Sequence, residues 1–349
     1  MNNQEHKRII GNLTPDFALN PVIESNKYGL VKQDSVINGF NLVSSKTNTE
    51  IEKLTNKGLI RTKNGDTDLT VIIKEYGKVQ LKASTTKLLT LFNMEFTNKG
   101  CSNTNIAIPL KELAELLGKK DLKTLRASVN EDLEALANIE LKAEITNHKK
   151  ERDYIDLKLI QKKGISKGVV FMEFTNDIAN HLKKCPIMPM PMELFTINSH
   201  KNPYSYYLGY KIYYQMRMNQ WDKASKEKKD HCIISVEKLL NICMENGLPS
   251  YEKVSQLNRA VEQKIIEPFT RDLDALQDLH LFKWEFCNAK GEPLTDEELD
   301  NKAYKDFIRR YVRIEYPNSY LIADFDKKKA EKKEKAKKKN KRKAKKNED

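Results

Sequence analysis

Apolar positions recur in the same order in two stretches of the chain. In the first stretch, residues 84–96 carry apolar side chains every three to four positions, which predicts a helix with a broad buried face. Residues 110–117 predict a short helix that begins after Pro109 and ends at Gly118, because proline is tolerated at a helix start and glycine is favoured just past a helix end. A longer helix is predicted for residues 122–137.

Strands are predicted on both sides of these helices. A β-branched run at residues 69–74 precedes them, and residues 139–145, 154–160 and 168–174 follow them. A basic turn at residues 147–152 joins the first two of the later strands. Short helix, turn, longer helix and β-hairpin is the order of a winged helix-turn-helix. In that unit the short helix braces the longer one in a major groove, and we expect the hairpin to lie along the phosphate backbone.

The second stretch begins with an aromatic helix. Tyrosines recur at helical spacing within residues 204–221, at positions 206, 210, 213 and 214. This spacing favours a core helix over a base-stacking platform, because such platforms usually lie on strands. The same order of elements then returns, with a short helix at 235–244, a longer helix at 253–276 that is interrupted by Pro268, and strands at 281–286 and 311–316.

A repeated segment supports the pairing of the two stretches. Residues 132–141 read DLEALANIEL and residues 272–281 read DLDALQDLHL, and both lie where the longer helix ends and the hairpin begins. Chance similarity between leucine-rich helix ends is the alternative explanation. The repeat favours two related modules over one module joined to an unrelated domain.

Both ends of the chain differ from its middle. Residues 1–65 are polar and rich in Asn and Lys, which predicts a flexible arm with one short helix at 47–59. Three prolines between residues 185 and 191 predict a linker or a tight crossing. The predicted fold class is α+β, with two tandem winged helix-turn-helix domains, a flexible N-terminal arm and a basic C-terminal tail. The predicted boundaries are 1–65 for the arm, 66–184 for the first domain, 185–203 for the linker, 204–322 for the second domain and 323–349 for a Lys-rich tail that is disordered or helical.

Charge is concentrated at the C-terminus. Residues 327–349 hold 14 Lys and Arg against 4 acidic residues, which is +10 of the total net charge of +13. The rest of the chain is nearly balanced, so its basic isoelectric point says little about the fold. We expect the tail to add salt-sensitive, sequence-independent attraction to phosphate, and a purely solubilising tail is the alternative.

No enzyme motif or cofactor motif is present. The cysteines are odd in number and form no CxxC pair, so neither a disulfide framework nor a zinc knuckle is expected, and a reducing cytoplasm fits. The histidines form no HxH pair, and no phosphate-binding loop, GxSxG or HExxH motif occurs. We therefore expect no catalysis, no metal and no cofactor. No apolar stretch reaches the roughly 18 residues of a membrane span, and the N-terminus has no signal-peptide core.

Three stretches carry a resemblance to a known family. Residues 169–182 read VVFMEFTNDIANHL, residues 204–214 read YSYYLGYKIYY, and residues 259–273 read RAVEQKIIEPFTRDL. Together they resemble the Rep-3 type family of iteron-binding plasmid replication initiators, which are tandem winged-helix proteins, over roughly residues 70–316. The chain departs from the family pattern in its longer N-terminal arm, its acidic loop at 292–300 and its lysine tail.

The resemblance implies a function. A member of this family would bind repeated double-stranded DNA sites at an origin, open the adjacent AT-rich duplex and recruit a host helicase or its loader. It also implies a homodimer, formed through the first domain, that represses its own gene, and a cytoplasmic, plasmid-associated or nucleoid-associated location. The alternatives are a winged-helix transcriptional regulator, a nickase or relaxase, and an RNA-binding or nucleoid protein driven by the tail.

Exposed polar residues of the predicted recognition helices are the candidate DNA contacts. Arg, Asn and Gln suit bidentate contacts to bases, whereas Lys mostly contacts phosphate, and the alternative is an ordinary solvated helix face or turn. The first-domain candidates are Lys119, Lys120, Lys123, Thr124, Arg126 and Asn130 in the helix-turn-helix and Lys149, Lys150 and Arg152 in the wing. The second-domain candidates are Ser255, Gln256, Asn258, Arg259, Gln263 and Lys264 in the helix and Lys283 and Lys290 in the wing. Because the second set is richer in Gln and Asn, we expect the second domain to read more of the DNA sequence.

Overall fold

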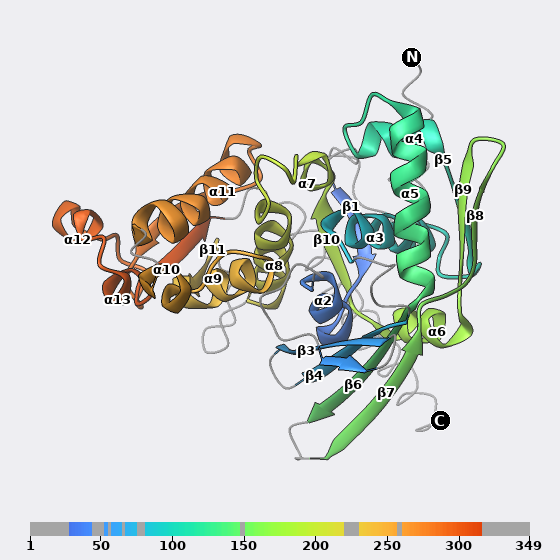
Figure 1. The fold of residues 1–349 in the computed structure, drawn as a ribbon, viewed down its shortest axis with the longest axis horizontal. Coiled ribbons are helices and arrows are strands. Elements are labelled where there is room, and N and C mark those ends of the chain that lie inside the picture. The colour runs from blue at the N-terminus through green and yellow to red at the C-terminus, as the bar shows by residue number, and fades with distance from the viewer. Residues whose placement is uncertain are drawn as a thin grey trace, which may run out of the picture.

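The computed structural model describes residues 28–43, 52–54, 57–64, 67–74, 81–146, 151–219, 230–256 and 260–315. Within them, helices and small antiparallel sheets form an α+β arrangement, which confirms the predicted fold class. Two groups of elements, called the first module (residues 83–174) and the second module (residues 205–315), lie side by side along the long axis of the molecule (Figure 1). Among the helices described, none is both long and apolar enough to cross a bilayer.

The first module has the element order of a winged helix. Its elements are α3 (Ala83–Asn98), β5 (Asn105–Pro109), α4 (Leu110–Leu116), α5 (Leu122–Ala137), β8 (Ile160–Ser166) and β9 (Val169–Phe174). The three strands form an antiparallel sheet in the order β5-β9-β8, so the strand that comes last along the chain lies in the middle. Helices α4 and α5 contact each other as the two helices of the helix-turn-helix.

Two residues determine the turn between α4 and α5. Gly118 adopts a φ of +61°, which glycine reaches without strain, and its N–H bonds back to the last turn of α4. Asp121 caps α5, because its carboxylate accepts a hydrogen bond of 2.9 Å from the backbone N–H of Lys123. The leucine and valine side chains along one face of α5 are buried, so the opposite face points out of the molecule.

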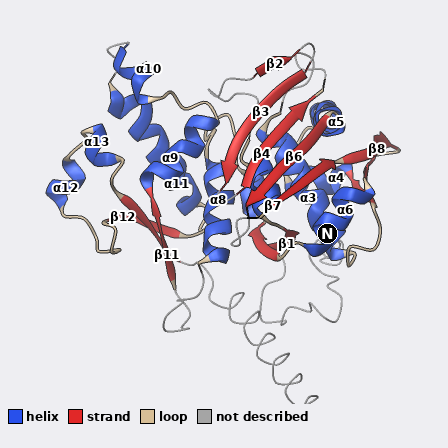
Figure 2. Cartoon of the chain, turned by 90° about the horizontal axis from the view of Figure 1, so that it is seen from below, coloured by secondary structure: helices blue, strands red, loops and turns tan. Residues whose placement is uncertain are grey.

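The hairpin that directly follows α5 belongs to a different sheet. Strands β6 (Ile139–Thr146) and β7 (Arg152–Lys158) complete the antiparallel order β2-β3-β4-β6-β7 (Figure 2). The other strands of this sheet are β2 (Glu52–Leu54), β3 (Lys57–Asn64) and β4 (Thr67–Ile73). The prediction that this hairpin is the wing is therefore wrong. The wing is the next hairpin, β8–β9, because only that pair shares the sheet with β5 in the described part of the chain.

The N-terminal segment, residues 28–43, is part of the folded core. Strand β1 (Tyr28–Lys32) leads into α2 (Ser35–Asn41), whose apolar side chains Val36 and Phe40 are fully buried. The prediction of a flexible arm up to residue 65 is wrong for this segment and for β3. The prediction of a helix at 47–59 is also wrong, because β2 and the start of β3 occupy the described part of that range.

The predicted linker also contains regular structure. Helix α6 (Asn176–Lys184) follows the wing, and β10 (Ile187–Pro191) pairs antiparallel with β1 before the short helix α7 (Glu193–Thr196). Strand β10 contains prolines, which lack the N–H that a central strand would need. They are tolerated because β1 and β10 form a two-stranded sheet, in which each strand has a free edge. The expected tight crossing is thus a strand.

The second module repeats the order of the first. Its elements are α8 (Ser205–Met218), β11 (His231–Ser235), α9 (Val236–Glu245), α10 (Tyr251–Gln256), the π-helix η1 (Glu262–Ile266), α11 (Glu267–Asp278), β12 (Lys283–Cys287), α12 (Asp296–Asp300), α13 (Tyr304–Phe307) and β13 (Tyr311–Glu315). The sheet order β11-β13-β12 matches β5-β9-β8. The predicted recurrence is confirmed, and the long loop before β13 contains α12 and α13.

The interruption predicted at Pro268 appears as a change of helix type. Proline has no N–H to donate to the carbonyl four residues earlier, so a regular helix would lose a hydrogen bond there. The chain instead forms η1 directly before α11, and the N–H of Glu267 bonds to the carbonyl of Glu262 five residues earlier. Such π-turns are uncommon and often lie at functional sites.

The internal repeat has a structural role. Asp132 in α5 accepts hydrogen bonds of 2.9 Å from Ser84 and 2.7 Å from Thr85, at the start of α3. Its counterpart Asp272 in α11 accepts bonds of 2.6 and 2.9 Å from the backbone N–H groups of Tyr204 and Ser205, at the start of α8. In each module, a buried aspartate of the long helix therefore holds the start of the first helix.

Helix α8 forms the junction between the modules. The hydroxyl of Tyr210 is buried and accepts hydrogen bonds from Gln33 and Asn41 of the N-terminal segment. The side chain of Asn246, at the end of α9, donates a bond of 2.9 Å to the carbonyl of Leu42. Tyr206, Tyr210 and Tyr213 are buried in one core that runs through both modules, which confirms the core interpretation of the aromatic helix.

Candidate nucleic-acid interface

The outer face of α5 is the clearest candidate surface for DNA. Lys123, Thr124, Arg126 and Asn130 are all exposed on it, as predicted, whereas Leu125 between them is buried. Figure 1 shows α5 on the outside of the first module, with the β8–β9 wing beside it. The structure thus brings these four predicted residues onto one accessible helix face.

The turn before α5 adds two lysines to the same end of the helix. Lys119 and Lys120 are exposed, and the N–H of Lys119 bonds to the carbonyl of Ala114, which fixes the turn at the end of α4. We call Lys119, Lys120, Lys123 and Arg126 the basic end of α5. In the part of the chain that the structure describes, none of these four side chains forms an ion pair. Their charges are therefore available to a phosphate backbone.

Thr124 has a different role from the one expected. Its hydroxyl donates a hydrogen bond to the carboxylate of Asp121, the N-cap of α5. That hydrogen bond, followed by those from the backbone N–H groups of Lys123 and Thr124, lowers the pKa of Asp121 below its usual value. The hydroxyl can still accept a hydrogen bond, but its proton is committed to the cap.

The order of charges along α5 opposes the helix dipole. Cations stabilise a helix when they lie near its C-terminus, and anions when they lie near its N-terminus, by about 0.3–1 kcal/mol each. In α5 the cations Lys123 and Arg126 lie in the N-terminal half, and the acids Glu131 and Glu134 lie in the C-terminal half. Helix stability does not account for this order. A phosphate-binding surface would account for it, because the N-terminal part of a recognition helix is the part that contacts DNA.

The acids of α5 are neutralised by lysines from elsewhere. Lys82 forms an ion pair of 3.0 Å with Glu131, and Lys163 of β8 pairs with Glu134. Negative charge on the helix is thus compensated, while the basic end keeps its charge. The exposed face of α5 is therefore net positive at the end nearest the turn.

The wing contributes a cation that the sequence-based prediction missed. Lys167 lies exposed at the tip of the β8–β9 hairpin, with a φ of +48°, and Gly168 follows at +75°. The carbonyl of Gly168 accepts a bond of 2.8 Å from the N–H of Leu110, which ties the tip to the start of α4. Gly168, directly before the apolar run at residues 169–171, is a turn signal that could have identified this hairpin.

The residues predicted for the first wing lie elsewhere. Arg152 begins β7 and forms an ion pair of 2.9 Å with Glu144 across the β6–β7 hairpin. That hairpin extends from the C-terminal end of α5, away from the basic end (Figure 1). The assignment of Arg152 to the wing is therefore wrong. Lys149 and Lys150 lie outside the described residues.

The predicted residues of the second module are only partly described. Ser255 is exposed at the end of α10, and Gln263 and Lys264 are exposed on η1. Lys283 and Lys290 are exposed at the start of β12 and in the turn after it. The side chain of Gln256, and all of Asn258 and Arg259, lie outside the described residues. The prediction that this module reads more sequence stays a prediction.

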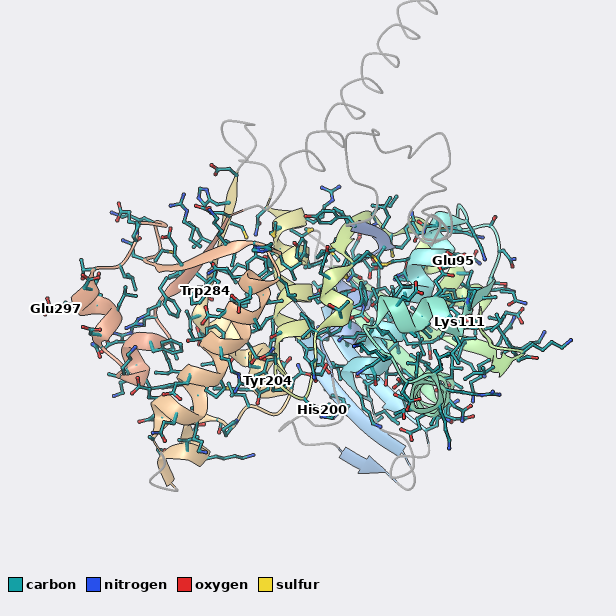
Figure 3. All side chains as sticks on the ribbon, turned by 90° about the horizontal axis from the view of Figure 1, so that it is seen from above. Glu95, Lys111, His200, Tyr204, Trp284 and Glu297 are labelled. Carbon is teal, nitrogen blue, oxygen red and sulfur yellow. The ribbon has the colours of Figure 1, made fainter. Side chains whose placement is uncertain are left out.

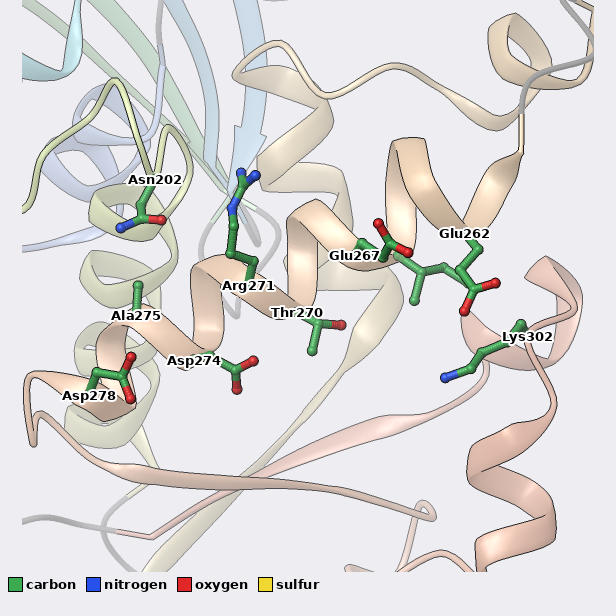
Figure 4. A pocket seen from close by; sticks show the side chains of 10 residues that line it. Asn202, Glu262, Glu267, Thr270, Arg271, Asp274, Ala275, Asp278 and Lys302 are labelled. Atoms are coloured by element: carbon green, nitrogen blue, oxygen red, sulfur yellow. The ribbon is translucent and has the colours of Figure 1, made fainter.

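The outer face of η1 and α11 is acidic. A shallow cavity of about 450 Å³ runs along it (Figure 4). Four carboxylates line this cavity against two cations, namely Glu262, Glu267, Asp274 and Asp278 against Arg271 and Lys302. The Arg271 guanidinium also bonds to Asp272 at 3.0 Å, so part of its charge is used within the helix. This part of the second long helix would repel phosphate.

A second cavity, of about 440 Å³, lies between α3, α5 and residues 195–203. Its wall includes His200, which Figure 3 places with Tyr204 between the two modules. The ammonium of Lys87 lies buried at its edge and donates bonds of 3.1 and 2.8 Å to the carbonyls of Phe195 and Ile197. Burial, with a smaller contribution from the charge of Lys119, lowers the pKa of Lys87 to about 7. These bonds tie α3 of the first module to the segment between the two modules.

Comparisons with known proteins do not identify the chain. No protein-family model matches it, and no curated protein matches it. A crystal structure of domains 2 and 3 of RctB aligns with 82% of this chain and 100% of its own length, at 10% sequence identity and a TM-score of 0.47. A second crystal structure of the RctB domains 2–3 aligns with 81% of this chain and 98% of its own, at 9% identity and a TM-score of 0.42. At these values the likeness is too weak to establish a shared fold or function.

Proposed function

We propose that this chain is a non-enzymatic, sequence-specific DNA-binding protein that initiates replication from repeated double-stranded origin sites. The observation that carries the proposal is the basic end of α5. It presents four cations without ion-pair partners among the described residues, at the helix end that contacts bases in helix-turn-helix proteins. Lys167 of the wing adds a phosphate contact from the adjacent hairpin.

The joint between the modules supports a long binding site. The hydrogen bonds of Tyr210 and the continuous core link the two helix-turn-helix units. Units held at a constant separation would contact one continuous stretch of DNA rather than two independent sites, with the acidic face of α11 turned away from the duplex. The resemblance to the Rep-3 type initiators supports the same function. Under this proposal the protein also opens AT-rich DNA, recruits a host helicase or loader, and forms a repressing homodimer through the first domain in the cytoplasm.

The test is a footprint on the DNA that flanks the coding region. An initiator protects several evenly spaced direct repeats beside an AT-rich stretch, and reactivity of that stretch to single-strand-specific reagents increases when the protein binds. Protection of a single palindrome would replace the proposal with a transcriptional regulator. A covalent protein–DNA adduct formed in the presence of Mg²⁺ would replace it with a nickase.

Removing the C-terminal tail provides a second test, which distinguishes sequence-specific DNA binding from binding driven by the tail. Removing residues 327–349 takes away +10 of charge, so affinity should fall and its salt dependence should weaken. The preference for specific over random DNA should persist, because sequence reading belongs to the helices. Binding that loses all sequence preference in the shortened chain would identify a tail-driven nucleic-acid binder instead.

A further inference from the structure

Three metal-ligating side chains converge where α2 meets the end of α6. Asp34, His181 and Cys185 each offer a donor atom, and these atoms all lie within 4.8 Å of one another. The Oδ2 of Asp34 and the Nε2 of His181 lie 2.8 Å apart. The group lies below the surface, with Cys185 buried and the other two side chains largely covered. It lies outside the proposed DNA-binding surface.

Local structure positions each of the three. Asp34 is the N-cap of α2, and its Oδ1 accepts bonds of 3.0 and 2.9 Å from the N–H groups of Val36 and Ile37. Its other oxygen is left to face α6. His181 lies in the last turn of α6 and Cys185 caps that helix four residues later, so both side chains project from one side.

The Nε2 nitrogen of His181 is ion-paired with Asp34 but makes no well-directed hydrogen bond. This nitrogen is buried, and the carboxylate oxygen of Asp34 is 2.8 Å away. At that distance the missing hydrogen bond means that the oxygen lies to one side of the direction in which the nitrogen would donate. Asp34 is thus a close partner of His181, but the direction in which Nε2 would bond stays open to a further partner between these side chains.

We propose that Asp34, His181 and Cys185 bind a zinc ion, with a water molecule as the fourth ligand. Imidazole nitrogen, thiolate sulfur and carboxylate oxygen are the zinc donors of proteins, at about 2.0–2.3 Å from the metal. Tetrahedral geometry then separates donor atoms by roughly 3.3–3.7 Å. Asp34 and His181, at 2.8 Å, would have to move apart by about half an ångström, and a pair at the 4.8 Å limit would have to close by about 1 Å. One carboxylate and one thiolate also neutralise the two positive charges of the ion, which burial requires.

Lys32 supports the proposed site. Its ammonium donates a hydrogen bond of 3.1 Å to the carbonyl of Cys185 and lies 3.4 Å from the carbonyl of Lys183. These contacts fix the backbone at the end of α6. Burial and the neighbouring Asp34 raise the pKa of the Cys185 thiol, and the charge of Lys32 opposes this only in part. A bound metal would therefore have to displace the thiol proton. Zinc would tie the N-terminal segment to α6, which is the helix that directly follows the wing.

Cobalt is a suitable probe, because Co²⁺ replaces zinc and a thiolate ligand gives it a charge-transfer absorption band. The full-length chain is stripped of metal with a chelator and titrated with Co²⁺. We expect the band to saturate at one equivalent and to vanish when zinc is added. The variant Cys185→Ser should lose the band. The matched control Cys232→Ser, at a buried cysteine in β11 of the second module, should keep it.

Thermal stability gives an independent readout. Asp34→Asn keeps an oxygen for the N-cap of α2 but removes the negative charge of the carboxylate. Zinc should therefore raise the melting temperature of the wild-type chain and raise that of Asp34→Asn much less. A wild-type chain that shows no thiolate–cobalt band and no zinc-dependent melting temperature overturns the proposal. So does a band that survives in Cys185→Ser.

Discussion

The two modules share one fold but differ in the charge of their long helices. The N-terminal end of α5 carries the cations of the basic end. The acids Glu131 and Glu134, farther along the helix, are paired with lysines outside it. The outward face of α11 carries Glu267, Asp274 and Asp278. A winged-helix fold therefore does not by itself make a DNA-binding surface; the placement of charge on the recognition helix does. We infer that the first module supplies most of the affinity for DNA.

A second difference lies in how each module holds its first helix. Asp132 binds two hydroxyl groups of α3, whereas Asp272 binds two backbone N–H groups of α8 and the guanidinium of Arg271. A hydroxyl group can donate or accept a hydrogen bond, so it can bind a charged or a neutral carboxyl group. Backbone N–H groups and a guanidinium only donate, so they favour the charged carboxylate. The same repeated aspartate is thus held in two electrostatic environments.

The largest expected effects concern the shared core. Leu133 and Leu273 occupy the same position of the repeat, and both are buried. Leu133→Ala and Leu273→Ala should each lower the free energy of unfolding by about 2–5 kcal/mol, because each removes buried apolar volume and leaves a cavity. Since one core joins the modules, both variants should shift a single common transition in denaturant.

Two signals separate the possible outcomes. Circular dichroism reports on the whole chain. Tryptophan fluorescence reports on residues 205–315, because both tryptophans of the sequence, at positions 221 and 284, lie in that range. Coincident transitions in both signals are expected for either variant. If Leu133→Ala moves the circular dichroism transition and leaves the fluorescence transition in place, the modules unfold separately and the shared-core comparison fails.

The next effect is a pH dependence located at Asp132. Burial raises its pKa to about 6, against the smaller opposing effects of Thr85 and Ser84. The folded state therefore binds the proton more tightly than the unfolded chain, whose aspartate titrates near 4. The stabilising contribution of the neutral acid is complete below about pH 4 and is lost as the pH rises through 6. By pH 7 the charged group costs about 2–3 kcal/mol of stability.

Asp132→Asn tests this assignment, because the amide keeps an oxygen for both hydroxyl groups and cannot titrate. The variant should match the wild type at pH 4 and exceed its stability at pH 7, measured by urea unfolding at each pH. Asp272→Asn serves as the comparison. Burial raises the pKa of Asp272 as well, but the hydrogen bonds from Tyr204 and the Arg271 guanidinium oppose the rise. Because Asp272→Asn also breaks the ion pair with Arg271, it should gain less stability at pH 7 than Asp132→Asn. Identical pH profiles for wild type and Asp132→Asn would contradict the prediction.

The third effect is on DNA affinity. The double variant Lys123→Ala/Arg126→Ala removes two cations from the basic end of α5. We expect affinity for the specific site to fall about 10- to 100-fold. The slope of log affinity against log salt concentration should decrease by about 2, because two contacts with phosphate are lost. Fluorescence anisotropy with labelled DNA at several salt concentrations measures both quantities.

The matched control removes the same charge from the β6–β7 hairpin. Lys142 and Arg152 form exposed ion pairs with Asp156 and Glu144, so their replacement by alanine changes stability little. Lys142→Ala/Arg152→Ala should reduce affinity by no more than its nonspecific electrostatic effect, about twofold. Equal losses in the two double variants would mean that overall charge, not the face of α5, governs binding.

The sequence predicted the long helices of the two modules well because their pattern is local. The spacing of leucines and the residues Gly118 and Pro268 indicate helix positions without knowledge of the rest of the fold. The exposed candidates on α5 follow from the same periodicity. The internal repeat added the correct inference that the second module copies the first.

The errors concern contacts between distant parts of the chain. Strand β6 follows α5 directly and resembles a wing strand, yet it pairs with β4, which precedes α3 in the sequence. The wing cation Lys167 was missed for that reason. The N-terminal segment looked like a polar arm because its Gln33 and Asn41 are polar, but both side chains bond to Tyr210 from more than 160 positions away. No local pattern contains these pairings.

The smallest expected effect compares the two wings. Lys167→Ala removes one exposed cation next to the basic end of α5, so affinity should fall about two- to fivefold and the salt slope by about 1. Lys290→Ala removes an exposed cation from the turn after β12, in the module whose long helix has an acidic outer face, and should have less effect. Both side chains are exposed, so neither change should alter the melting temperature measurably. If Lys290→Ala weakens binding as much as Lys167→Ala, then the second module lies as close to the DNA as the first. The acidic face of α11 must in that case point away from the duplex.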